Sequence, residues 1–402
     1  MLRIVSAAAA LALAVSFFAP TNGFATEYDI KASLSGGSTS NLFNDSTSRD
    51  DTFSAVSLEV KFIPAGFASA NLLGDYIHYG DYFRLSNLRY GGGLTVIPMS
   101  DSSRLSLLLE GNILKREYHG NDSDSTSINP NEITGNEYDA ALSARYDLTP
   151  TFRLRTGISF TESEYDVEGV LDRMTVGVTI GGNASFWNNL SLDCEGGYQR
   201  GKFQHIDPFV HLFGLLLPRR AILPGQQYSI LLEDNLNSVY VSPRLATNIG
   251  KKTGVSLTYS YRRFLDFDDD AIIYGYSTGY LSPWLGSFAG NAAVLRLKTF
   301  LVPRLITTLS VGFWERDHLR TVEQELRPDR FGRIVPDINL LYAQNRTDWR
   351  RRIDLRLQWP LSFSGGAVLE PSLELDFTDN NSSVQVYDCT NFSLSVGVVA
   401  RL

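Results

Sequence analysis

Apolar and polar residues alternate along residues 349–359, with Arg351 as the one exception. The apolar positions are Trp349, Ile353, Leu355, Leu357 and Trp359, and the polar ones are Arg350, Arg352, Asp354, Arg356 and Gln358. A period of two is that of a β-strand with one apolar and one polar face. Ten residues at about 3.3 Å each, in a strand tilted by about 40°, project to roughly 25 Å, the height of the apolar band of a membrane β-barrel. The segment therefore predicts one membrane-crossing strand, and a soluble sandwich would rarely bound such a face with two tryptophans.

The same alternation recurs along the chain. Residues 138–148 place Tyr138, Leu142 and Tyr146 on one face, and residues 152–160 place Phe152 and Ile158 on one face. Aromatic side chains that bound an apolar strand face are typical of the girdles at the two membrane interfaces. We therefore predict that the membrane girdle includes Tyr138, Tyr146, Trp349 and Trp359.

Short turn signals and long polar connections alternate between these runs. The short turns fall at residues 64–66, 98–103, 149–150, 188–189, 251–252, 302–303 and 360–362, and the long connections at 40–51, 119–135, 203–237, 266–287 and 317–344. One strand on each side of every turn predicts an all-β, transmembrane antiparallel up-and-down β-barrel of about 16 strands, with 14 to 18 fitting nearly as well. Both termini are expected at the short-turn end. Residues 26–402 are expected to form a single domain.

The first 25 residues have the features of a signal peptide. Arg3 precedes an apolar run, and Gly23-Phe24-Ala25 forms a small-x-small cleavage site. We expect the mature, exported protein to begin at Thr26. Its hydrophobic content of 43% is ordinary for a soluble domain, and a barrel conceals its membrane signal in alternation. The cysteines Cys194 and Cys389 are expected to be unpaired, with a disulfide as the alternative in an exported chain.

The last residues carry the most specific signal. Ser395, Gly397, Ala400 and Leu402 fill the places of a polar, glycine, apolar and terminal apolar residue. In this the chain resembles the bacterial outer-membrane β-barrel superfamily, over roughly residues 26–402, although the usual last residue there is aromatic and Leu402 departs from it. The resemblance implies that these four residues form the assembly signal. It also implies that the protein is integral to the outer membrane, with outer-membrane lipid, lipopolysaccharide and the barrel assembly machinery as partners.

A barrel of this size predicts a porin-like channel for passive passage of hydrophilic solutes, because about sixteen strands enclose an aqueous interior. The pore-lining candidates are charged residues on polar strand faces: Arg153, Arg155, Arg262, Arg296, Lys298, Arg350, Arg352, Arg356, Glu370 and Glu374. Two interpretations remain open. The cations favour anionic solutes, or the charges pair across strands and brace the wall. A hairpin pivot near Ser362 would place Arg350 opposite Glu374.

Residues 203–237 are too apolar for a freely solvated loop. We expect them to fold into the barrel as a constriction or to cover its mouth, and an extended wall or an extra hairpin is the alternative. The constriction-loop candidates are Phe209, His211, Phe213, Leu215, Arg219 and Arg220.

Other functions find less support in the sequence. A partner-dependent barrel for exopolysaccharide export, or a sheath around a periplasmic multihaem cytochrome in extracellular electron transfer, would use the same architecture. The chain has no Cys-x-x-Cys-His, His-Glu-x-x-His or P-loop motif, so we predict no cofactor, no metal and no nucleic-acid partner. A surface hydrolase built on Asp317 and His318 is a weaker alternative, and we expect no enzyme activity and no catalytic residue.

Overall fold

The structure is a computed structural model. It describes residues 27–41, 50–65, 67–81, 86–97, 104–118, 134–165, 173–186, 189–206, 231–265, 272–275, 288–302, 304–328, 334–338, 344–363, 366–383 and 388–402. The predicted signal peptide lies outside these residues. Every regular element in the described ranges is a β-strand.

The strands follow one another along the chain with the bounds β1 (Glu27–Thr39), β2 (Asp51–Ala65), β3 (Ala68–Tyr79), β4 (Asn87–Val96), β5 (Leu105–Tyr118), β6 (Thr134–Thr149), β7 (Phe152–Tyr165), β8 (Arg173–Phe186), β9 (Leu190–Ile206), β10 (Leu231–Ile249), β11 (Thr253–Phe264), β12 (Ile272–Gly275), β13 (Phe288–Val302), β14 (Leu305–Pro328), β15 (Ile334–Ile338), β16 (Gln344–Gln358), β17 (Leu361–Ser362), β18 (Val368–Ser382) and β19 (Cys389–Arg401).

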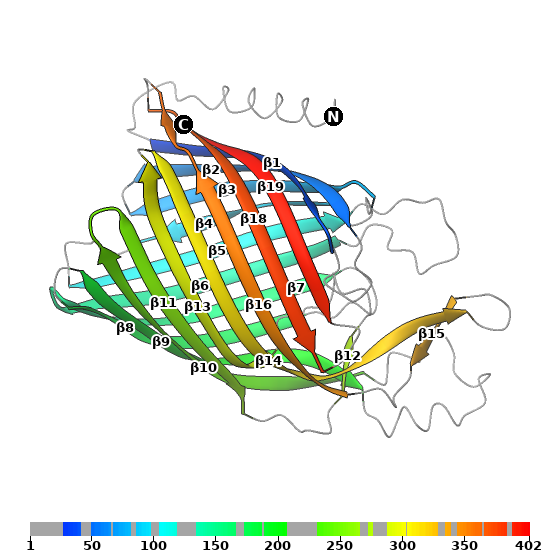
Figure 1. The fold of residues 1–402 in the computed structure, drawn as a ribbon. Helices are drawn as coiled ribbons and strands as arrows, with labels where there is room; N and C mark the ends of the chain where they lie inside the picture. Colours follow the sequence, from blue (N-terminus) through cyan, green and yellow to red (C-terminus); the bar gives the residue numbers. More distant parts are fainter. Residues whose placement is uncertain are drawn as a thin grey trace.

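Sixteen of these strands pair antiparallel with their sequence neighbours, and β1 pairs with β19 to close the ring. Three short strands lie outside this ring. β12 pairs with β9 and β14, β15 pairs with β14, and β17 pairs with β18. The wall curves into a barrel, shown in Figure 1. The predicted fold class and the predicted strand number are confirmed.

Each predicted short turn separates two consecutive ring strands, because proline, glycine or asparagine ends the extended run there. Two long connections are shorter than predicted. β9 and β10 extend into residues 203–237 and pair as far as Ile206 with Leu231. β14 runs on to Pro328 and pairs with β15, within residues predicted as a loop. Strand pairing continues beyond the wall here, which period-two alternation does not signal.

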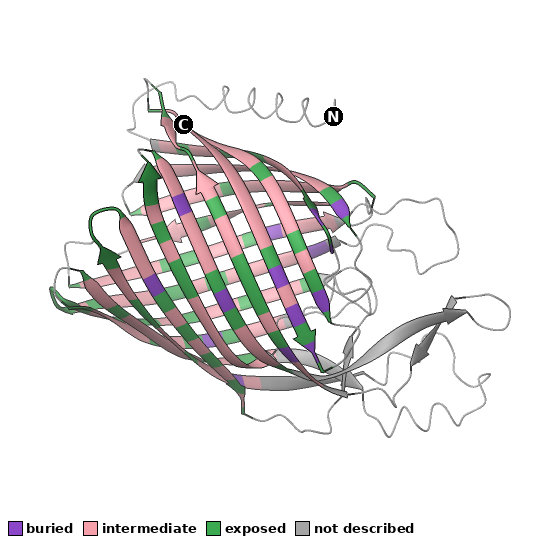
Figure 2. Cartoon of the chain, viewed as in Figure 1, coloured by how far each residue is buried: buried purple, intermediate pink, exposed green. Residues whose placement is uncertain are grey.

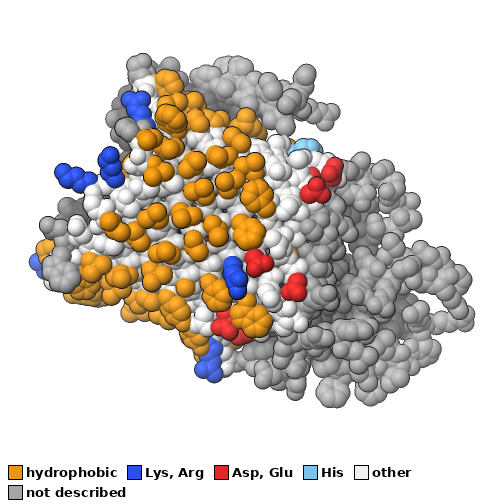
Figure 3. Space-filling model, in the orientation of Figure 1, with side chains coloured by type: hydrophobic (Ala, Val, Ile, Leu, Met, Phe, Trp, Pro, Cys, Tyr) orange, Lys and Arg blue, Asp and Glu red, His pale blue; other side chains and the backbone are white. Residues whose placement is uncertain are grey.

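The outer face of the wall is apolar. Leu142, Ile158 and Val178 are neighbours on β6, β7 and β8 and are 47%, 55% and 47% exposed. Exposed apolar side chains recur at alternate positions on the other strands, so exposed and less exposed residues alternate along the wall in Figure 2. Figure 3 shows apolar side chains spread over the near wall, with charged groups toward the strand ends. Such a belt on a closed barrel is typical of strands that cross a membrane.

No helix in the described ranges has the length and apolar character needed to cross a membrane.

The hairpin of β16 and β18 differs from the prediction. Arg350 pairs with Asn380, and Glu374 pairs with Arg356 instead. The two strands are centred three residues beyond the predicted pivot at Ser362, because β17 continues the pairing past Pro360 before the chain turns. Glu374 thus pairs six residues further along β16 than predicted. Because six is an even number, the predicted faces remain correct while the predicted pair is wrong.

Candidate functional site

The inner face of the barrel carries charged and hydroxyl side chains at the positions between the apolar outer ones. Alternation along each strand assigns the face, because successive side chains point to opposite sides of a sheet. All of the predicted pore-lining residues fall on this inner face: Arg153, Arg155, Arg262, Arg296, Lys298, Arg350, Arg352, Arg356, Glu370 and Glu374. Their role in passing a solute stays a prediction.

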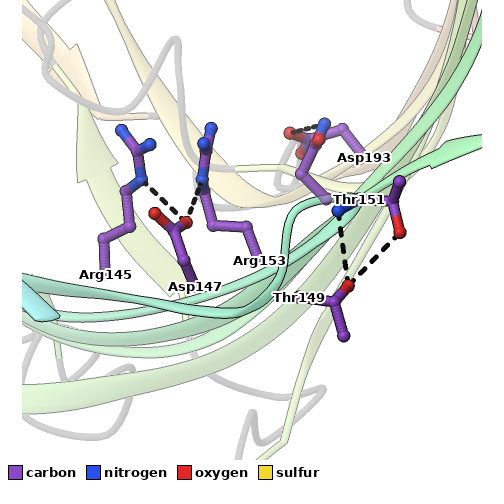
Figure 4. A network of polar contacts seen from close by, with 7 residues as sticks. Arg145, Asp147, Thr149, Thr151, Arg153 and Asp193 are labelled. Atoms are coloured by element: carbon purple, nitrogen blue, oxygen red, sulfur yellow. Dashed lines mark hydrogen bonds and ion pairs between the residues drawn. The ribbon is translucent and has the colours of Figure 1, made fainter. Parts of the chain in front are cut away.

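Two arginines share one carboxylate near the turn between β6 and β7. The Nε atom of Arg153 lies 2.6 Å from an oxygen of Asp147, and the Nε atom of Arg145 lies 3.5 Å from the same oxygen. Figure 4 shows both guanidinium groups flanking Asp147. The hydroxyl of Thr149, the last residue of β6, lies 3.2 Å from that of Thr151 in the turn. The three charges thus link two strands at the short-turn end of the wall.

A second network connects β7 to β10. The Nη2 atom of Arg155 lies 2.7 Å from Asp193 and 3.6 Å from Glu195. Asn183 donates a 3.3 Å hydrogen bond to Asp193, and the hydroxyl of Tyr240 donates a 3.1 Å hydrogen bond to Glu195. Sequence analysis missed Asp193, Glu195 and Tyr240. Asp193 and Glu195 occupy alternate positions of β9, so the sequence pattern could have placed them on the inner face, although Gly196 and Gly197 interrupt that pattern.

The wall on the other side of the seam is paired in the same way. Arg356 lies 2.7 Å from Glu374, and Arg401 lies 3.2 Å from Glu370. Arg352 forms an ion pair with Asp376. The arginine side chains are 45–51% exposed and the carboxylates 14–31%. Because water screens the arginine end of each pair, each contributes about 0–1 kcal/mol. The observed pairs support the interpretation that inner charges brace neighbouring strands.

One sector of the inner wall differs. No carboxylate occupies an inner position of β11, of β10 from residue 238, of β13 from residue 290 or of β14 up to residue 316, the part of that sector whose side chains the structure describes. The same sector presents Arg244, Arg262, Arg296 and Lys298. Arg262 donates a 3.0 Å hydrogen bond to the amide oxygen of Gln199. This carboxylate-free sector, β10 to β14, is therefore the basic side of the lumen.

Two glycines on the inner face leave the space that an aromatic ring occupies. A Cβ atom on Gly197 would approach the ring of Tyr240 to 2.6 Å, and one on Gly312 would lie 2.1 Å from the indole of Trp314. Arg316 lies over that indole, 5.8 Å from the ring centre. Because Gly197 and Gly312 have no side chain, Tyr240 can lie beside Glu195 and Trp314 can lie against its own strand.

Tyrosines mark the loop-side edge of the apolar belt. Tyr90 donates a 2.9 Å hydrogen bond to Glu117, Tyr198 a 2.6 Å bond to Asn237, and Tyr259 a 2.5 Å bond to Asn291. An outward tyrosine whose hydroxyl meets a polar group toward the rim fits a membrane interface. The predicted girdle residues Tyr146, Trp349 and Trp359 are exposed and Tyr138 is half-buried on the same outer face, and their girdle role stays a prediction.

The predicted assembly-signal residues all lie at the end of the chain, on or directly after β19. Gly397 pairs with Ser35 of β1 and Ser372 of β18, so it lies in the seam that closes the barrel. Ser395 shares its inner face, while Ala400 lies on the outer face with Leu402, which is 68% exposed. Recognition of these residues by assembly factors stays a prediction.

Some candidates fall outside the described residues. They are the predicted constriction-loop residues Phe209, His211, Phe213, Leu215, Arg219 and Arg220. Within the described part of the chain, no group of three or more His, Cys, Asp or Glu residues is placed to hold a metal ion. Cys194 and Cys389 are not joined by a disulfide, as predicted.

The closed antiparallel ring, the apolar outer face and the charged inner face define the class of the molecule, a transmembrane β-barrel. No family model and no curated protein matches the chain. Among solved structures, it resembles Acinetobacter baumannii OccAB1 with a TM-score of 0.46 and 10% identity, over 96% of this chain and 99% of that one. It resembles Pseudomonas aeruginosa OccK8 (OprE) with a TM-score of 0.45 and 11% identity, over 95% and 100%. It resembles CdiB from Acinetobacter baumannii with a TM-score of 0.49 and 12% identity, over 92% of this chain and 60% of that one. At these identities the likeness concerns the fold and assigns no solute or activity.

Proposed function

We propose that the protein is a porin-like channel of the bacterial outer membrane, through which hydrophilic solutes pass passively. The closed ring of sixteen strands carries this proposal. About eight strands leave an interior that side chains fill, whereas about sixteen leave room for water. The proposal includes no bond chemistry.

The inner face supports the proposal through its polarity. Charged side chains such as Arg153, Arg155 and Arg356 are about 40% to 46% exposed although they point into the barrel. A charged group keeps such exposure only where water reaches it, because a dry interior would impose a large desolvation cost. The proposed partners are outer-membrane lipid, lipopolysaccharide and the barrel assembly machinery, with no nucleic acid.

Single-channel recording in a planar bilayer tests the proposal. The purified mature chain, refolded and shown by a heat-dependent gel shift to be folded, should give stable ohmic openings in KCl. The heat-unfolded chain serves as the control and should be silent. A folded barrel that inserts but passes no current would contradict an open channel and would favour a barrel filled by a partner, as in polymer export or a cytochrome sheath.

Deletion of residues 209–218 tests the proposed constriction. If this segment narrows the path, its removal should raise the single-channel conductance, because the narrowest cross-section limits the current. A deletion of similar length within residues 122–131, in another long connection, is the matched control. An unchanged conductance in the first deletion would contradict the constriction and leave the channel proposal standing.

A further inference from the structure

Two cations lie side by side on the inner face of β13 without a carboxylate partner. Arg296 and Lys298 are both exposed, and neither side chain forms an ion pair or a hydrogen bond to any part of the chain that the structure describes. They occupy successive inner positions of one strand, roughly 7 Å apart along the backbone. Their charges therefore add in one small area of the wall.

The residues paired with these cations on the two neighbouring strands are small, and most of them carry a hydroxyl group. Arg296 pairs with Ser256 of β11 and Ser310 of β14, and Lys298 pairs with Gly254 and Thr308. We refer to Arg296 and Lys298 with the flanking Ser256, Thr308 and Ser310 as the β13 patch. Its side chains offer guanidinium, ammonium and hydroxyl donors and not one carboxylate acceptor.

Other inner cations show what is unusual about the patch. Arg153 is held by Asp147, Arg155 by Asp193 and Glu195, and Arg356 by Glu374, at 2.6 to 3.6 Å. These carboxylates already occupy the hydrogen-bonding groups that an incoming anion would need. A mobile anion would have to displace them, whereas no carboxylate is bonded to Arg296 or Lys298, and Asp354 lies one strand further away, beside Ser310.

We propose that the β13 patch binds the carboxylate or phosphate group of an anionic solute during its passage. The inference rests on the proposed channel function and names the solute class. A guanidinium offers paired N–H donors to two oxygens of one anionic group, an ammonium adds a point charge, and serine and threonine hydroxyls donate to the remaining oxygens. Because the patch is hydrated, binding is weak and reversible, with a dissociation constant on the order of 1 mM. Weak binding suits a channel, since a solute must leave as readily as it enters.

Block of the KCl current by inorganic phosphate tests the proposal in the full refolded barrel. Wild-type current should fall with phosphate concentration to a plateau, because phosphate held at the patch obstructs chloride. The R296Q/K298Q variant should raise the half-blocking concentration by at least about tenfold, equivalent to 1.4 kcal/mol. R296K/K298R keeps the charges and should keep the block within about threefold of wild type.

A matched control separates a site from a general basic potential. Arg244→Gln removes one exposed, inner cation of the same sector, and Lys298→Gln removes one from the patch, so the net charge changes equally. Lys298→Gln should weaken the block and Arg244→Gln should not. Equal weakening by both variants would overturn the site, as would a wild-type current that phosphate does not reduce while conductance is normal.

A silent barrel would defeat the channel proposal and not the patch. In that event, broadening of the ³¹P resonance of phosphate by the detergent-solubilised chain gives the same comparison without conduction. Broadening that R296Q/K298Q removes and Arg244→Gln retains supports the patch. Absence of broadening in the wild type, or its persistence in R296Q/K298Q, overturns it.

Discussion

An arginine placed on the outer face should destabilise the barrel far more than one placed on the inner face next to it. Ile158 lies near the middle of β7, between Leu142 and Val178, and is 55% exposed toward the expected lipid. Ser159 is the next residue and faces inward between Ala141 and Gly177. Ile158→Arg and Ser159→Arg therefore add the same charge at almost the same depth, on opposite sides of the wall.

The structure gives the expected difference. An arginine at the lipid midplane costs about 2–4 kcal/mol. Loss of the isoleucine adds about 1 kcal/mol, since roughly half of a side chain worth about 1.5–3 kcal/mol on burial contacts lipid here. Ile158→Arg should thus lower the free energy of unfolding by about 3–5 kcal/mol, a decrease in the folding equilibrium constant on the order of a hundred- to several-thousand-fold. Ser159→Arg should cost no more than about 1 kcal/mol, because its guanidinium reaches water beside residues with small side chains.

Reversible urea unfolding in phospholipid vesicles, followed by tryptophan fluorescence, measures both values. Ile158→Ala separates the loss of apolar contact from the effect of charge and should account for only about 1 kcal/mol. Equal destabilisation by the two arginine variants would refute the assignment of faces and, with it, the hydrated lumen. A larger effect at Ser159 would mean that the inner face is the dry one.

Three further predictions concern the inner wall and the thiols. Gly312→Ala should lower the free energy of unfolding by about 1–3 kcal/mol, because its Cβ atom would lie 2.1 Å from the indole of Trp314; Gly111→Ala, with its nearest neighbour at 3.8 Å, is the control for urea unfolding, and equal effects would contradict this explanation. A double-mutant cycle on Arg155→Gln and Asp193→Asn should give a coupling free energy under about 1 kcal/mol, since both side chains are partly exposed; a coupling above 3 kcal/mol would mean a dry interior. Electrophoresis with and without reductant should give one mobility, because the two cysteines lie on β9 and β19 and form no disulfide; a faster non-reduced band would show an intramolecular disulfide.

Much of the fold is predictable because a barrel strand must satisfy two solvents at once. Lipid on one side and water on the other impose alternation, and residues 349–359 obey it at every position except Arg351. Turn chemistry then separates the strands, as Thr149 and Pro150 do between β6 and β7. Together these two signals predict strand number, antiparallel order and the face of each residue.

Strand register is less accessible to the sequence. Arg350 and Arg356 lie on the same inner face, and either of them preserves the alternation when placed opposite Glu374. Only the length of the turn distinguishes the two arrangements, and the proline near its start does not fix that length. The predicted end of β14 is too early for a related reason. The strand continues beyond the apolar belt, where lipid no longer imposes alternation.

The same limit applies to the candidate site. The sequence predicts that Arg155 and Arg296 both face the lumen. It does not predict that one meets Asp193 and Glu195 while the other lies between Ser256 and Ser310, because each partner belongs to another strand. Charge pairing in a barrel depends on register, so the distinction between a bracing cation and a free one needs the structure.

The pairing of β1 with β19 has a consequence for how the chain is made. It joins the first described strand to the last, as in the hydrogen bond from Thr39 to Asn391, across 352 positions of sequence. By loop-closure entropy alone, this costs only about 2.5 kcal/mol more than closing a loop of about 20 residues. The greater difficulty is kinetic, because all other ring contacts join strands adjacent in the chain. Until β19 arrives, the nascent sheet has two open edges that any other extended chain could join. These two edges stay open to non-native pairing until β19 pairs with β1 and closes the ring.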